Sequence, residues 1–294
     1  MNASVKNPPY AAAEQLEPLV RRVLARNPSA FTFTGTQSYI VGDGDAVAVI
    51  DPGPDREEHL AALLEAIGDA KVAAILCTHT HRDHSPAAAP LAARTGAPVI
   101  GCARLILDDD GPRSDAPFDQ TYHPDRVLAD GESVSGPGWT LTAVATPGHT
   151  SNHLCFALEE SRALFTGDHV MAWSTSVITP PDGDMAAYMD SLQKLHGRAD
   201  RIYYPAHGPA AEKPRQLVRG MIGHRRQREN QILKLLGEGI VTIEGMVPRM
   251  YKGVDQGLWP AAGRSVRAHL IDLERKGRVR HTGQPGETAW ERID

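Results

Sequence analysis

Three histidines and one aspartate crowd into a single short stretch of the sequence, His79-Thr80-His81-Arg82-Asp83-His84. Imidazole nitrogens and carboxylate oxygens at this spacing are metal ligands far more often than packing groups. Burying so many polar side chains without partners would be costly, which argues against a purely structural origin. The stretch therefore predicts a metal-binding loop.

The residues on either side indicate which elements hold this loop. Residues 72–77, just before it, form a short apolar run that is typical of a buried strand in a covered sheet. Ser85-Pro86, just after it, is typical of a helix start, with serine as the N-cap and proline at the first helical position. The histidines would then lie on a strand-to-helix loop, where open α/β architectures place their ligand sites.

Three further motifs follow in order along the chain: Thr146-Pro147-Gly148-His149-Thr150, Phe165-Thr166-Gly167-Asp168-His169 and Tyr204-Pro205-Ala206-His207-Gly208-Pro209. Together with the first stretch they resemble the signature of the metallo-β-lactamase-fold superfamily. The four motifs span more than half of the chain. The resemblance implies a fold of the α/β class, an αββα sandwich.

Carried over motif by motif, the resemblance implies two metal sites: His79, His81 and His149 for the first, and Asp83, His84 and His207 for the second. Asp168 would bridge the two metals, and Asp83 is also the candidate catalytic carboxylate. The ligand types suit two Zn²⁺ ions, although Fe or Mn also binds such ligands. Two metals about 3.5–4 Å apart can share a water and lower its pKa towards 7. The resulting bridging hydroxide would attack a carbonyl carbon or a phosphorus.

Asp168 also bears on the substrate. True β-lactamases usually carry a cysteine or serine at this motif, whereas an aspartate resembles the glyoxalase II, RNase Z and general hydrolase branches. We therefore expect β-lactam hydrolysis to be weak or absent.

Several other polar residues near the motifs are not expected to bind metal. His59 falls in a predicted helix, and His123 stands alone in an irregular segment. His153 and His169 adjoin motif positions and are expected to be structural or to lie behind the ligands. Asp51 belongs to an Asp-Pro-Gly turn and is expected to have a supporting role only.

The length of 294 residues allows one large domain or two ordinary ones, and the composition of 41% hydrophobic and 23% charged residues is that of a water-soluble globular protein. No apolar run approaches the roughly 20 residues of a membrane span. Charged residues between Glu14 and Arg22 interrupt any secretory signal. The three cysteines lie in apolar segments and predict buried free thiols in a reducing, cytoplasmic compartment: Cys77, Cys102 and Cys155.

The net charge of −5 is unevenly distributed. Residues 1–214 carry 16 Lys and Arg against 27 Asp and Glu, whereas residues 215–294 carry 15 against 9. The first part is therefore acidic, at −11, and the second is basic, at +6. This asymmetry predicts two domains, 1–214 and 215–294, and a basic region that either meets an anionic partner or is simply solvated.

The order of elements follows from periodicity. Helical spacing predicts helices over 12–24, 55–67, 88–94 and 185–196. Strands are expected over 30–41, 46–50, 98–101, 141–145, 154–158, 163–165 and 202–204. Residues 104–128 are the least periodic part and predict an acidic loop, interpreted as an insertion over the site.

The C-terminal region predicts a winged-helix-like domain. Helices are expected over 217–236, 242–251 and 260–276, the second bent or restarted at Pro248. Residues 278–281 and 288–291 then read as a two-stranded hairpin. Three helices followed by a hairpin is the plan of a winged helix.

A metallo-β-lactamase domain followed by this module resembles the beta-lactamase-like protein 2 family. Further residues that carry the resemblance are Pro181-Asp182-Gly183-Asp184, Tyr188, Ser191-Leu192, His224-Arg225, Met250-Tyr251, His269-Leu270 and Leu273-Glu274. The family includes single-stranded RNA endonucleases, and also thioesterases and hydrolases of unknown substrate.

Three functions are therefore open. The resemblance and the basic region favour a phosphodiesterase that cleaves single-stranded RNA. Asp168 and the acidic body favour a glyoxalase II-like hydrolase of a thioester or another small acyl substrate, because an acidic surface repels a polyanion. The third is a non-enzymatic nucleic-acid-binding regulator. A homodimer is compatible with each, and no membrane partner is expected.

Overall fold

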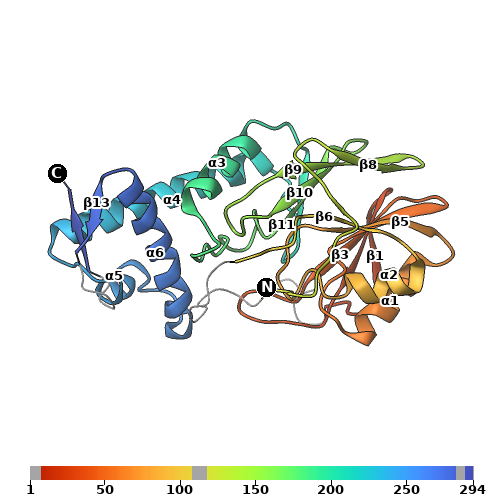
Figure 1. The fold of residues 1–294 in the computed structure, drawn as a ribbon, viewed down its shortest axis with the longest axis horizontal. Helices are drawn as coiled ribbons and strands as arrows, with labels where there is room; N and C mark the ends of the chain where they lie inside the picture. The colour runs from red at the N-terminus through yellow and green to blue at the C-terminus, as the bar shows by residue number, and fades with distance from the viewer. Residues whose placement is uncertain (1–7, 108–117, 283–288, 294) are drawn as a thin grey trace.

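The structure is a computed structural model of the chain and describes residues 8–107, 118–282 and 289–293. Two β-sheets lie face to face with helices on their outer sides, and a smaller, mainly helical unit stands at one end (Figure 1). The body is thus the expected αββα sandwich, followed by the expected winged-helix-like unit. Among the described residues, no helix has the length and apolar character needed to cross a bilayer.

The first sheet has seven strands in sequence order: β1 (Ala13–Glu17), β2 (Val20–Leu24), β3 (Gln37–Val41), β4 (Ala46–Ile50), β5 (Lys71–Cys77), β6 (Val99–Gly101) and β7 (Arg126–Val127). The pairs from β1 to β4 are antiparallel, and those from β4 to β7 are parallel. Helix α1 (Glu57–Ile67) connects β4 to β5 and helix α2 (Ala88–Thr95) connects β5 to β6, because parallel neighbours need a long crossover, usually a helix.

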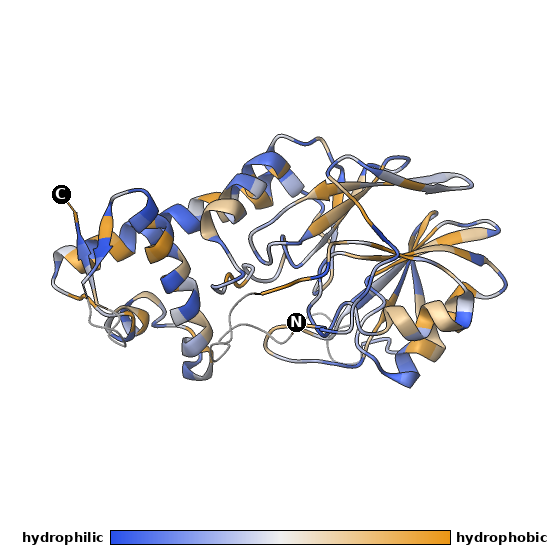
Figure 2. Cartoon of the chain, viewed as in Figure 1, coloured by the Kyte–Doolittle hydropathy of each residue, from blue (hydrophilic) through white to orange (hydrophobic). Residues whose placement is uncertain are grey.

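The second sheet has the order β12-β11-β10-β9-β8, from five strands: β8 (Ser133–Gly136), β9 (Trp139–Ala145), β10 (Leu154–Leu158), β11 (Ala163–Gly167) and β12 (Ile202–Pro205). Only the β11–β12 pair is parallel, and helix α3 (Met185–His196) connects these two strands. Figure 2 shows orange, hydrophobic segments along the strands of both sheets. The fully buried strands β3, β10 and β11 are covered on both faces, whereas β1, β7 and β8 are partly exposed.

Strand β10 shows how alternation builds the two layers of the core. Leu154, Phe156 and Leu158 face the first sheet, whereas Cys155 and Ala157 face the helices on the other side. Successive residues of a strand point to opposite faces, so one apolar strand supplies both layers.

The C-terminal unit contains α4 (Pro214–Gly237), α5 (Ile243–Met250), a 3-10 turn η2 (Gln256–Leu258), α6 (Trp259–Arg275), β13 (Val279–His281) and β14 (Trp290–Arg292). The first half of α4 packs on the second sheet through Val218 and Ile222. Its second half packs on α5 and α6 through Ile232 and Leu236. Because α4 contributes to both cores, the division at 214/215 stays a prediction.

Several expected elements differ from the structure. Helix α2 begins at Ala88, and its N-cap is Ala87 and not Ser85. Residues 12–24 form the β1–β2 hairpin and not a helix, because Pro18 disfavours a continuous helix and β2 pairs on both sides with neighbouring strands. The strand expected over 30–41 is confined to Gln37–Val41. Helix α5 continues through Pro248, so it does not restart there, and a bend at this proline stays a prediction. The acidic residues 108–110 and the hairpin turn 283–286 lie outside the described residues.

Candidate metal centre

Four strand ends deliver the motif residues to one place. The motifs begin directly after β5 and β9 and overlap the ends of β11 and β12. The chain turns at Gly148, whose φ is 137°, just before His149. A Cβ atom there would lie 2.3 Å from Tyr188 Cα on α3, so only glycine fits. This close contact presses the turn that carries His149 against α3.

The first cluster brings together His79, His81, His149 and Asp168, whose candidate ligand atoms all lie within 4.8 Å of one another. His81 Nδ1 is 3.0 Å from His79 Nε2 and 3.1 Å from His149 Nε2. Nitrogens bound to one tetrahedral zinc at about 2.0–2.1 Å are separated by about 3.3 Å. The spacing of the three imidazoles therefore fits a single shared metal ion.

The second cluster contains Asp83, His84 and His207. Asp83 Oδ2 lies 3.4 Å from His84 Nε2 and 3.1 Å from His207 Nε2. His84 Nε2 is buried and has no hydrogen-bond partner among the described residues. A buried nitrogen in that state is costly unless a cation takes its lone pair.

Asp168 stands between the two clusters. Its Oδ1 is 3.2 Å from His207 Nε2, and its Oδ2 is 3.6 Å from His84 Nε2 and 3.7 Å from His149 Nε2. One carboxylate thus faces imidazoles of both clusters. This is the position that a bridging ligand of two metals would occupy.

Backbone carbonyls hold the outer nitrogens of two of these imidazoles. His149 Nδ1 donates to the carbonyl oxygen of Val177 at 2.7 Å, and His207 Nδ1 donates to that of Gly35 at 3.2 Å. A carbonyl can only accept, so each Nδ1 carries the proton and each Nε2 keeps its lone pair. The tautomers needed for metal binding are therefore set by the fold.

Asp51 performs the same task for His84. Its Oδ2 is 3.0 Å from His84 Nδ1 and accepts from Thr78 Oγ1, while its Oδ1 accepts from the Thr78 backbone amide. Asp51 is buried and has a positive φ of 47°. The supporting role expected for this turn residue is thus to orient an imidazole and the start of the histidine loop.

The electrostatics of the site favour a bound cation. Burial lowers the pKa of His79 well below 6.5 and that of His81 to about 3, so both imidazoles stay neutral. Burial alone would raise the pKa of Asp168, but His207 and His84 outweigh it and lower that pKa. Burial would likewise lower the pKa of His84, yet Asp83 and Asp168 raise it well above 6.5. The negative carboxylates thus favour positive charge at this site, and bound divalent metals would supply it.

The turn that carries His149 is held by hydrogen bonds to its backbone and to the neighbouring segment at Ser176. Arg225 of α4 donates to the carbonyl of Ser176, the residue before Val177. The Asp184 amide donates to the Gly148 carbonyl at 2.9 Å, and Ser191 Oγ donates to that of Pro147 at 2.8 Å. In the sequence, Arg225, Asp184 and Ser191 could be noticed only as part of the family resemblance. Their role depends on backbone carbonyls, which leave no trace in side-chain patterns.

The histidines that were not expected to bind metal lie outside both clusters. His59 is buried, with Nε2 2.8 Å from Ser38 Oγ, so it packs in the interior away from both clusters. His153 Nε2 accepts from the Asp168 amide at 3.3 Å and therefore lies behind a candidate ligand. His169 is buried close to His153, with ring centroids 5.7 Å apart. His123 is exposed.

The sequence model described as "Metallo-beta-lactamase superfamily" matches residues 31–207, more than half of the chain. The chain belongs to the metallo-beta-lactamase superfamily. A second model, "Beta-lactamase associated winged helix domain", matches residues 242–290. With its His/Asp site of two clusters, this superfamily member is a metal-dependent hydrolase. It is therefore an enzyme, and a purely non-enzymatic regulator is set aside.

Two curated relatives of this superfamily member illustrate the range of names among its relatives. A "Beta-lactamase-like protein 2 homolog" of Drosophila melanogaster is 33% identical over 281 residues, 92% of each chain. An "Atrochrysone carboxyl ACP thioesterase" of Aspergillus fumigatus is 36% identical over 234 residues, 78% of this chain and 68% of the relative. The resemblance to the beta-lactamase-like protein 2 family is confirmed.

Solved structures show the same fold. A beta-lactamase domain protein from Burkholderia ambifaria has a TM-score of 0.80 at 20% identity, covering 100% of this chain and 99% of its own. A metallo-beta-lactamase family protein from Thermus thermophilus has a TM-score of 0.75 at 21% identity, covering 95% and 100%. Both likenesses include the C-terminal unit, since they cover nearly the whole chain.

Proposed function

We propose that this metallo-beta-lactamase superfamily member is a dinuclear hydrolase of acyl thioesters. Its metals are held by His79, His81 and His149, by Asp83, His84 and His207, and by Asp168 between them. Bound there, two divalent metals supply a nucleophilic water at neutral pH and polarise the carbonyl that it attacks. Water adds to the thioester carbonyl carbon, the carbon–sulfur bond breaks, and a carboxylate and a thiol are released.

The residues of this chain prepare the site in two ways. Val177 and Gly35 accept the outer protons of His149 and His207, so the ligand nitrogens are ready without rearrangement. Asp83, with 28% of its side chain exposed, is the most open of the candidate carboxylates. It is therefore placed to meet the substrate as well as a metal.

The choice of substrate rests on the ion pairs made by two cations at the end of α6. Arg275 pairs with Asp184 of the body, and Lys276 Nζ lies 2.7 Å from Asp272 Oδ2. These are two of the side chains that an RNA-binding winged helix would present to phosphates. The pair between Arg275 and Asp184 joins α6 to the body and supports a packing role, whereas Lys276 and Asp272 are one helical turn apart. The thioesterase relative, 36% identical, adds to the case for an acyl substrate.

The second candidate is a phosphodiesterase that cleaves single-stranded RNA. It is supported by the excess of six positive charges over residues 215–294. The 33% identity to a beta-lactamase-like protein 2 homolog also supports it, through the family resemblance described above. The same two metals would then activate water for attack on phosphorus.

We also propose zinc as the resident metal, because three imidazoles in a compact cluster suit Zn²⁺ well. Fe or Mn remains compatible with the carboxylates of the second cluster. Cytoplasmic residence is supported by three buried free thiols, Cys77, Cys102 and Cys155. A homodimer stays a prediction.

A panel of substrates tests the proposal. Zinc-loaded protein is assayed on acyl thioesters, S-lactoylglutathione, single-stranded RNA, a chromogenic phosphodiester and a β-lactam, beside an Asp83→Ala control. We expect kcat/KM for the best thioester in the common enzyme range, about 10⁴–10⁸ M⁻¹s⁻¹, with the other classes far below. Efficient RNA cleavage without thioester turnover would reject the proposal in favour of the second candidate.

A further inference from the structure

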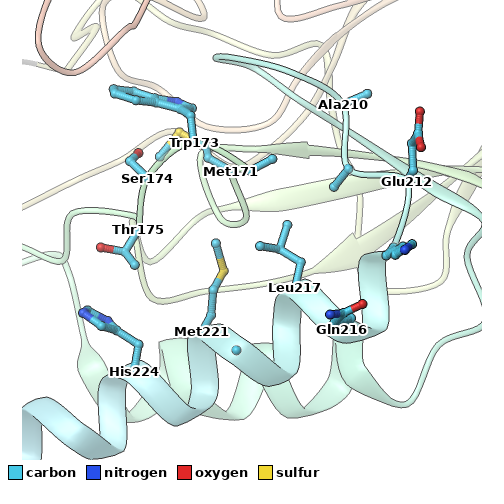
Figure 3. Close-up of a pocket in the computed structure, with 14 residues that line it drawn as sticks. Met171, Trp173, Ser174, Thr175, Ala210, Glu212, Gln216, Leu217, Met221 and His224 are labelled. Atoms are coloured by element: carbon cyan, nitrogen blue, oxygen red, sulfur yellow. The ribbon is translucent and has the colours of Figure 1, made fainter. Parts of the chain in front are cut away.

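A pocket lies where the segments that follow Asp168 and His207 meet the first half of α4, so it is built partly from the C-terminal unit. Its volume is about 790 Å³, within the range of small-molecule sites. It lies between the segment Met171–Thr175, the segment Ala210–Lys213 and the first half of α4 (Figure 3). Met171, Leu217 and Met221 give it an apolar lining. Glu212 and Gln216 are exposed at one end, and His224 marks the other.

Chain connectivity keeps this pocket close to the ligands. Met171 follows Asp168 by three residues, and Ala210 follows His207 by three. Three residues of fully extended chain span at most about 11 Å. Both lining segments are therefore direct continuations of ligand loops, and a substrate of ordinary size can reach from the metals into the pocket.

Trp173 joins the pocket to the metal-bearing loops. It lines the pocket, and a Cβ atom on Gly208 would lie 2.3 Å from Trp173 Cδ1, so the indole packs directly on the residue after His207. The Phe33 ring lies 5.0 Å from the Trp173 ring. Trp173 thus also lies close to the loop whose Gly35 carbonyl accepts from His207.

We propose that this pocket binds the acyl group of the substrate, an apolar chain or ring system, while the thioester carbonyl lies at the metals. The inference rests on the proposed thioesterase function and names the site that selects the acyl group. Burying an apolar group among methionine, leucine and tryptophan side chains is favourable by about fourfold in affinity per methylene. Met side chains also adapt to differently shaped ligands.

Gly220 offers a direct way to fill the pocket. It lines the pocket from α4, and a Cβ atom there would meet no other atom within 4 Å. A Gly220→Leu side chain would therefore enter the pocket without a clash. Gly223, one turn further along α4, is equally open but does not line the pocket. Gly223→Leu is thus a matched control, and leucine in place of helical glycine favours the helix in both variants.

The experiment measures binding and turnover separately. Zinc-loaded wild type, Gly220→Leu and Gly223→Leu are titrated by calorimetry with two non-hydrolysable thioethers, S-decyl-pantetheine and S-methyl-pantetheine. The same proteins are assayed on acetyl, hexanoyl and decanoyl thioesters of pantetheine. We expect Gly220→Leu to bind the S-decyl probe about tenfold or more weakly, with the S-methyl probe unchanged. Decanoyl turnover should fall relative to acetyl turnover, and Gly223→Leu should match wild type.

Two failures are distinguishable. If the S-decyl probe binds wild type and Gly220→Leu alike, the pocket assignment is overturned, whatever the turnover. If the probe binds and Gly220→Leu weakens it but no thioester is hydrolysed, the pocket stands as an apolar ligand site and the proposed thioesterase function is rejected. Equal weakening by Gly223→Leu would indicate a general effect on α4 and would also overturn the assignment.

Discussion

The guanidinium of Arg225 donates a hydrogen bond to the backbone carbonyl of Ser176, 49 residues earlier in the chain. The next carbonyl, that of Val177, accepts from the candidate ligand His149. Arg225 is buried and also lies over the Tyr188 ring, 5.0 Å from its centroid. One side chain of the C-terminal unit thus sets the position of a carbonyl next to the one that orients an imidazole of the metal centre.

Replacing Arg225 by lysine should therefore weaken metal binding. The ammonium keeps the charge but cannot reproduce the planar guanidinium contact. Loss of a direct partner of a metal ligand typically costs about 10–100-fold in metal affinity. Arg225 acts one residue further away, through Ser176, so the lower end of that range, about tenfold, is the upper bound here. We expect a loss of up to this size for zinc, measured by competition with a chromophoric chelator. Arg226→Lys, an exposed change on the same helix, is the control. Equal zinc affinity in the two variants, with unchanged circular dichroism, would contradict the positioning role.

Asp83→Ala should remove one metal site and leave the other. Asp83 belongs to the second cluster, whereas the three imidazoles of the first cluster stay in place. Elemental analysis of dialysed protein should fall from about two metal ions per chain to about one, with hydrolysis lost. Asp55→Ala, an exposed aspartate outside both clusters, should retain wild-type metal content. Full activity with one ion or none in the wild type would reject a dinuclear site.

Arg275→Ala should lower stability and leave RNA affinity unchanged. Arg275 pairs with Asp184, but its side chain is 59% exposed, so the pair is worth about 0.2–1 kcal/mol after solvent screening. The expected fall in Tm is about 1–3 °C. Adding Asp184→Asn to Arg275→Ala should cost less than the sum of the two single changes.

The RNA alternative predicts a different outcome for the triple variant Arg275→Ala, Lys276→Ala and Arg278→Ala. If these cations contact phosphates, RNA affinity should fall, and the salt slope should decrease by up to about three. Filter binding at two salt concentrations, beside size-exclusion chromatography, separates this outcome from a loss of packing. A clear decrease in the salt slope would favour RNA.

Acid should destabilise the packing of the C-terminal unit through His269. Burial lowers its pKa from 6.5 to about 3, and Arg225, His224, Lys276 and Arg228 act in the same direction. Below pH 6.5, His269 is therefore protonated in the unfolded chain but stays neutral in the folded chain. The free energy of unfolding then decreases as the pH falls towards the folded pKa. The loss approaches about 1.4 kcal/mol per pH unit for one group.

His269→Gln removes this proton and should flatten the dependence of Tm on pH between 6.5 and 4.5. His123→Gln, at an exposed histidine, should leave the wild-type dependence unchanged. If the wild type and His269→Gln lost Tm in parallel, His269 would not be the group that titrates.

The sequence pointed to the candidate ligands because the residue types themselves carry the chemistry, and the structure brings these residues together in two clusters at strand ends. It predicted the winged-helix plan for a similar reason, since Val266, Leu270 and Leu273 repeat at helical spacing and are all fully buried in α6. The N-terminal hairpin was missed because Leu16, Leu19 and Val20 also fit a helical period. Strand pairing, which is a tertiary effect, decided between the two.

The contacts that orient the ligands were out of reach for another reason. The partners of His149 and His207 are carbonyl groups, which every residue carries. Arg225 could be noticed as part of a family resemblance, but its target depends on where α4 lies. Asp51 looked like an ordinary turn former, and only its distance to His84 shows what it holds.

Helix α4, which contributes to both cores, has a mechanical consequence. Its 24 residues form a rod about 36 Å long, and no flexible linker separates the two units along it. Rotating one unit against the other would require breaking backbone hydrogen bonds within the helix or pulling apolar side chains out of a core. The two units should therefore tumble in solution as one rigid particle, with a single rotational correlation time for amides on either side of α4.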